Sequence, residues 1–74
     1  MTEQHKASMH KRFYRYLLEK VREDRYPSTI MLDILERGLR GRERQRFVEI
    51  LLEKAMADRF PSIPMLERIA RIAG

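Results

Sequence analysis

The side chains of this 74-residue chain that could act as catalysts or metal ligands are few. His5 and His10 are five residues apart, so on a helix they do not share one face and form a weak metal pair. The only serines are Ser8, Ser28 and Ser62, of which Ser28 and Ser62 are explained as helix caps, and cysteine is absent. The chain has no glycine-rich phosphate loop. The sequence therefore predicts a protein that is not an enzyme, with no catalytic residue, metal site, cofactor or small-molecule substrate.

Basic side chains are the more abundant candidates for binding, because 16 lysines and arginines outnumber 11 acidic residues. Two groups of them could contact nucleic-acid phosphates: Lys11, Arg12, Arg15 and Arg22 in the first, and Arg37, Arg40, Arg42 and Arg44 in the second. Glu19 opposes the first group, and Glu36 and Glu43 interrupt the second. A solvated arginine-rich surface that binds nothing is the alternative interpretation.

Apolar side chains at the edges of the expected helices form a second candidate surface, made of Tyr14, Tyr16, Ile34 and Met56. Tyrosine, methionine and arginine are enriched in protein–protein interfaces. The alternative is that these residues complete the core, and for Leu18 and Leu52 that alternative is the favoured one.

These residues belong to a chain that repeats itself. Residues 12–40 align without a gap on residues 46–74, and 13 of the 29 aligned pairs are identical. A fixed period of this size indicates a duplicated supersecondary unit. Tetratricopeptide repeats have the same period, but their small and aromatic positions do not fall on matching residues; Gly38, for example, aligns with Ile72.

The core of the repeat is a five-residue turn, DRYPS in the first copy and DRFPS in the second. Proline disfavours the helical conformation in the residue before it, and serine suits the first position of a new helix. We expect the aspartate to reach amides of the next helix and the arginine to meet the last carbonyls of the previous one, although a paired acidic ligand site is an alternative. The turn residues are Asp24, Arg25, Pro27 and Ser28, then Asp58, Arg59, Pro61 and Ser62.

Apolar residues recur with helical spacing before and after each turn. Met9, Phe13, Leu17 and Val21 define one face in the first copy, and Phe47, Leu51 and Ala55 the matching face in the second. The pattern predicts helices near residues 8–25, 28–38, 42–58 and 62–73, with residues 1–7 disordered. Gly38 and Gly41 flank the join, where glycine tolerates the left-handed backbone that closes a helix.

The expected architecture is a single all-α domain, residues 1–74, in which two helical hairpins close around a pseudo-twofold axis. The first repeat spans about 8–40 and the second about 42–74. The DR-aromatic-PS turn followed by a Met-Leu pair resembles small two-repeat helical proteins of high-GC bacteria, over most of the chain. This resemblance implies the fold and a bacterial source and no function.

The chain has no apolar segment long enough for a bilayer and no signal peptide at its start, so the expected compartment is the cytoplasm and no membrane partner is expected. The favoured hypothesis is a helical protein–protein interaction module, either a homodimer or an accessory subunit of a larger complex. The alternative hypothesis is a basic helical protein that binds nucleic acid.

Overall fold

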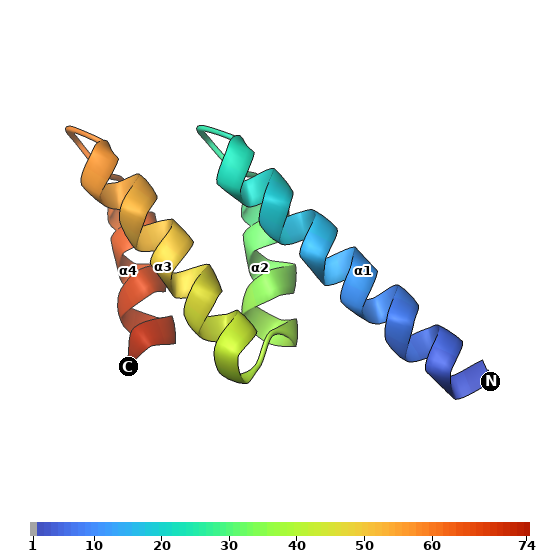
Figure 1. The fold of residues 1–74 in the computed structure, drawn as a ribbon. Coiled ribbons are helices and arrows are strands. Elements are labelled where there is room, and N and C mark those ends of the chain that lie inside the picture. The colour runs from blue at the N-terminus through green and yellow to red at the C-terminus, as the bar shows by residue number, and fades with distance from the viewer. Residues whose placement is uncertain (1) are drawn as a thin grey trace. The chain divides into compact units, whose positions relative to one another are not determined.

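The computed structural model describes the backbone of residues 2–74 and the side chains of residues 9–74. Over this range the chain forms four helices joined by short non-helical links, and it has no strand (Figure 1). The helices are α1 (Thr2–Glu23), α2 (Thr29–Gly38), α3 (Gly41–Ala57) and α4 (Ile63–Ala73). The predicted all-α class and the number of helices are confirmed. The predicted closure of the two copies around a pseudo-twofold axis stays a prediction.

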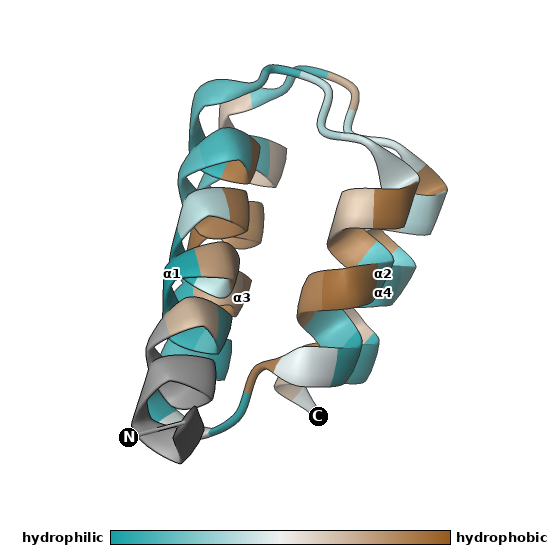
Figure 2. Cartoon of the chain, turned by 90° about the vertical axis from the view of Figure 1, so that its right-hand side faces the viewer, coloured by the Kyte–Doolittle hydropathy of each residue, from teal (hydrophilic) through white to brown (hydrophobic). Residues whose placement is uncertain are grey.

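The chain divides into two units, residues 1–38 and residues 39–74. In the first unit, α2 returns beside α1 and packs against it (Figure 1). Leu17 and Val21 from α1 are buried, as are Leu32 and Leu35 from α2. Figure 2 shows the hydrophobic positions of α1 on the side that faces α2. Burying each of these side chains stabilises the pair by about 1.5–3 kcal/mol.

The second unit has the same two-helix arrangement, in which α3 packs against α4. Phe47 and Leu51 from α3 are fully buried, and Ala55 and Ile72 are buried as well. Arg68 in α4 differs from these apolar residues, because it is charged and yet buried, with 9% of its surface exposed. No buried side-chain nitrogen or oxygen among the described residues lacks a hydrogen-bond partner, so the Arg68 guanidinium does not carry the cost of an unpaired buried charge.

Helix α1 begins earlier than the sequence predicts, at Thr2 instead of near residue 8. Residues 2–7 contain no proline or glycine and include good helix formers such as glutamate, lysine and alanine, so nothing local ends the helix there. The side chains of residues 1–8 lie outside the described part. The predicted disorder of residues 1–7, and any role of His5, therefore stay predictions.

Three residues that the sequence placed in the core are exposed: Met9 and Phe13 on α1, and Leu52 on α3. Met9 and Phe13 are about half exposed, whereas Leu17 and Val21 on the same helix are buried. For Met9 the reason lies in the lengths: α1 has 22 residues and α2 has 10, which correspond to about 33 Å and about 15 Å, so the N-terminal half of α1 extends past the end of α2. Length does not account for Phe13, because Tyr14 beside it packs over Gly38 of α2 and the equivalent Phe47 is fully buried.

Serine begins the second helix of each unit. The Ser62 hydroxyl, at the N-cap of α4, accepts a hydrogen bond from the Met65 amide at 3.2 Å. The Ser28 hydroxyl accepts from the amides of Ile30 and Met31 at 3.2 and 3.4 Å. Both hydroxyls thus satisfy amides that have no partner within the helix.

Glycine suits the two positions at the join, 38 and 41, for different physical reasons. Gly41 has φ +57°, a left-handed conformation that disfavours other residues, and it opens α3 instead of closing a helix. Gly38 has an ordinary backbone, but a Cβ atom there would collide with the ring of Tyr14. Glycine at position 38 therefore leaves room for the ring of Tyr14, which any larger residue would displace.

Candidate interaction surface

The first basic group lies on α1 and is exposed. Lys11, Arg12, Arg15 and Arg22 all lie on the surface of the helix. Arg22 forms an ion pair with Glu19 at 3.8 Å, in which both side chains are more than half exposed. Such an exposed pair stabilises a helix by only a few tenths of a kcal/mol. The arrangement leaves a basic stripe along α1 that Glu19 partly neutralises.

The second basic group is distributed over the ends of two helices and the link between them. Arg37 lies in the last turn of α2, Arg40 precedes α3, and Arg42 and Arg44 lie in the first turn of α3. The Arg40 guanidinium donates to the Leu39 carbonyl at 2.9 Å, and Arg44 is half-buried. Arg37 belongs to the first unit and the other three to the second, so the structure does not establish them as one patch.

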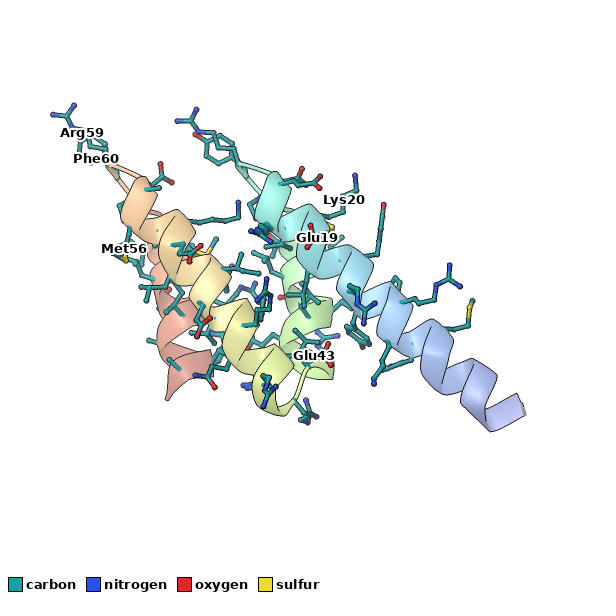
Figure 3. The ribbon with its side chains drawn as sticks, viewed as in Figure 1. Glu19, Lys20, Glu43, Met56, Arg59 and Phe60 are labelled. Carbon is teal, nitrogen blue, oxygen red and sulfur yellow. The ribbon has the colours of Figure 1, made fainter. Side chains whose placement is uncertain are left out.

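The arginine of each turn lies over the aromatic ring that follows it. The Arg25 guanidinium is 5.6 Å from the centre of the Tyr26 ring, and that of Arg59 is 5.8 Å from the Phe60 ring (Figure 3). The sequence predicted contacts with helix carbonyls instead. A cation over an exposed ring contributes about 0.5–1 kcal/mol, which accounts for an arginine before an aromatic residue in both copies.

The turn aspartates end the first helix of each unit through their backbone. The Asp24 amide donates to the Lys20 carbonyl at 2.9 Å, and the Asp58 amide donates to the carbonyls of Lys54 and Ala55 at 3.2 and 3.3 Å. Pro27 and Pro61 are half-buried. The predicted contacts of the Asp24 and Asp58 carboxylates with amides of the next helix stay predictions.

The four residues proposed as a partner surface fall into two classes. Tyr14 and Ile34 are half-buried, and Tyr14 packs over Gly38 with its ring centre 4.5 Å from His10 and 5.5 Å from Phe13. Tyr14 is thus mainly a packing residue of the first unit. Tyr16 and Met56 are exposed and available to a partner.

Exposed apolar side chains of the first unit gather on one flank of the α1–α2 pair. Met9, Phe13 and Tyr16 line an open depression together with Arg12. At 100° per residue these positions lie to one side of the Leu17–Val21 line, whereas Leu18 lies to the other. In α2, Ile30 and Ile34 are displaced toward the same flank. We call this set the first patch: the exposed residues Met9, Phe13, Tyr16 and Ile30, with the half-buried Ile34 beside them.

Exposed apolar side chains of the second unit gather on the opposite flank of their helix pair. Leu52 and Met56 lie one turn apart on α3, and Ile63 and Leu66 lie one turn apart on α4. Figure 3 shows Met56 on the side of α3, below Arg59 and Phe60 at the turn. Ala70 follows Leu66 by one turn and is exposed. We call this set the second patch: Leu52, Met56, Ile63, Leu66 and Ala70.

Each flank of the repeat is exposed in one copy and buried in the other. Phe13 is 48% exposed, whereas its equivalent Phe47 is 0% exposed. Leu52 is 46% exposed, whereas its equivalent Leu18 is 8% exposed. The same reversal holds for Tyr16 against Ile50 and for Leu66 against Leu32. Because Phe and Leu are identical in the two copies, no sequence pattern could have identified which of them is exposed.

At five positions of these flanks the exposed copy carries the more apolar residue, whereas Tyr16, opposite Ile50, and Glu23, opposite Ala57, are exceptions. In the first patch, Met9 stands opposite Glu43 of the other copy and Ile34 opposite Arg68. In the second patch, the substitutions are Met56 for Arg22, Ile63 for Thr29 and Ala70 for Glu36. A surface in contact with water alone has no physical requirement for this bias. This comparison is the signal that could have found Met9, Ile63 and Ala70 from the sequence.

None of the described helices combines the length and apolar content needed to cross a bilayer. The described residues also contain no group of three or more histidine and acidic side chains that could hold a metal ion. Comparison of the chain with protein-family models, with curated proteins and with solved structures gave no match.

Proposed function

We propose that this protein is a non-enzymatic helical module that binds other protein chains. Each copy of the repeat would form one helical hairpin, α1–α2 and α3–α4, and the two hairpins would make one domain. The observation that carries the proposal is the pair of apolar patches, because contiguous exposed apolar residues with a charged rim are typical of protein-binding surfaces.

The small size of the protein supports the same conclusion. A chain of this length buries only about 60% of the surface that it exposes when unfolded, and chains in this range often gain stability from a partner. Covering Phe13, Leu52 and Leu66 would add apolar burial at about 25 cal/mol per Å². A partner that covers a patch would therefore stabilise the fold as well as bind it.

The proposal is tested with a double variant, Tyr16→Glu with Met56→Glu, which places one charge in each patch. We expect the wild-type protein to associate, with itself or with a captured protein, and the double variant to lose this association. Arg15→Glu is the matched control, since it changes an exposed residue of α1 outside both patches and should retain association. A wild-type chain that stays monomeric and captures no protein would contradict the proposal.

Nucleic-acid binding is a second candidate, supported by the exposed stripe of Lys11, Arg12, Arg15 and Arg22 on α1. Binding through this stripe would be strongest at low salt and would be lost when Arg12, Arg15 and Arg22 are replaced together by glutamine. Titration of labelled duplexes at two salt concentrations measures the affinity of this binding. Absence of binding at low salt excludes this candidate.

A further inference from the structure

We propose that the partner of each patch is a second copy of this chain, so that the first patch of one copy docks on the second patch of the next. This inference rests on the proposed protein-binding function and identifies its partner. The contact is head to tail, because it joins two different surfaces of identical chains.

The first argument comes from the repeat itself. Each flank is buried in one copy and exposed in the other, so both flanks carry side chains that are suited to burial. Proteins built from repeats stack each unit on its neighbour, and their terminal repeats need polar outer faces to remain soluble. Neither exposed flank of this chain has a polar outer face of this kind. On the first flank, Met9 and Ile34 stand where the other copy has charged residues, and on the second flank Met56 and Ala70 do. A further copy of the same repeat matches these uncapped flanks.

The second argument comes from charge. Arg12 lines the depression of the first patch, and the Lys20 ammonium lies 5.7 Å from the centre of the Tyr16 ring (Figure 3). The rim of the second patch carries exposed Glu49 and Glu53 on α3 and Glu67 on α4, with Arg59 as the basic residue at the turn above Met56. Glu49 precedes Leu52 by three residues, and Glu53 precedes Met56 by three, so each lies one turn from a patch residue.

These charges favour the head-to-tail contact over the two symmetric ones. If two first patches met, Arg12 and Lys20 of one chain would face the same basic residues of the other chain. If two second patches met, Glu49 and Glu53 would likewise face acidic residues. Like charges across an interface oppose binding, whereas opposite charges set the orientation. Glu19, three residues beyond Tyr16, and Glu23, seven residues beyond it, are exposed acidic residues near the first patch that the docked chain would have to avoid.

A contact between two different surfaces leaves one patch free at each end of a pair. Assembly therefore continues into a ring or an open filament, depending on the rotation between neighbours, and does not stop at a dimer. The mass of the particle should increase with concentration beyond that of two chains.

The experiment uses two variants of the full chain, Tyr16→Glu in the first patch and Met56→Glu in the second. Both side chains are well exposed, so both variants should fold, which circular dichroism checks. Light scattering and analytical ultracentrifugation measure mass against concentration. We expect each variant alone to be monomeric, with a dissociation constant raised about tenfold or more. We expect an equimolar mixture of the two to form a one-to-one dimer, because the mixture retains one intact patch of each kind.

Three results would overturn the inference. The first is a wild-type chain that stays monomeric at every accessible concentration. The second is a mixture of the variants that stays monomeric although the wild type associates. The third is a variant that still dimerises alone, which would indicate a symmetric contact through its intact patch. A monomeric wild type that captures another protein through Tyr16 or Met56 would refute self-assembly and leave the proposed function in place.

Discussion

At the scale of single residues, the side chain of Tyr14 on α1 fills the space beside Gly38 on α2. The Tyr14 ring approaches so closely that a Cβ atom at position 38 has no room. The equivalent positions of the second copy hold Val48 and Ile72, a smaller residue on the long helix and a larger one on the short helix. The two copies thus fill the same space between their helices with opposite distributions of side-chain volume. This accounts for the difference in sequence at these two pairs of positions.

The first prediction concerns this pair. Gly38→Ala should lower the free energy of unfolding by about 1–3 kcal/mol, because the new methyl group forces the Tyr14 ring aside. Adding Tyr14→Val should recover most of the loss, since it restores the distribution of volume found in the second copy. Urea denaturation of the single and double variants measures the coupling. Gly41→Ala is the control: it introduces strain at φ +57°, and Tyr14→Val should not relieve it.

At the scale of the elements, much of the structure could be predicted from the sequence. The DR-aromatic-PS turns and the apolar spacing located all four helices, because proline and serine act locally through backbone geometry and capping. The start of α1 was missed because no local residue marks it. The exposure of Met9 was missed because it depends on the length of α2, a property of another element.

The second prediction concerns the start of α4. Ser62→Ala removes the hydroxyl that accepts from the Met65 amide, so the free energy of unfolding should fall by about 0.5–2 kcal/mol. Ser28→Ala should have a similar effect on α2, where the hydroxyl serves two amides. Thermal and urea denaturation measure both. Thr29→Ala, next to Ser28 and exposed, should change stability by no more than about 0.5 kcal/mol. An equal loss in all three variants would refute a capping role.

At the scale of the whole molecule, the two patches show what the repeat could and could not predict. Tyr16 and Met56 were identifiable because they differ from their equivalents, Ile50 and Arg22. Phe13 and Leu52 were not, because the identical residues Phe47 and Leu18 are buried. Exposure is a property of what surrounds a residue, so two identical positions can differ in it. Any function of this protein is therefore expected on the flanks where the two copies differ in exposure.

The last prediction tests the charges around those flanks. Arg12→Glu should weaken self-association by about two- to fivefold, because a charge pair at the rim of an interface contributes about 0.2–1 kcal/mol. Glu49→Arg should weaken it by a similar factor. Mixing the two variants should restore part of the affinity, because the two substituted positions then carry opposite charges again, with their signs exchanged. The mixture should therefore associate more tightly than either variant alone.

Sedimentation at low and moderate salt separates this electrostatic contribution from the apolar one. Salt should weaken the wild-type association and reduce the difference between the wild type and each variant, because these charges are exposed and are screened within about 10 Å at 0.1 M salt. Lys11→Glu makes the same change of charge as Arg12→Glu at a position about 100° around α1 and farther from the first patch, and should have a smaller effect. If Lys11→Glu weakens association as much as Arg12→Glu does, net charge alone accounts for the result. In that case the apolar side chains would set the head-to-tail orientation, and the rim charges would only adjust the affinity.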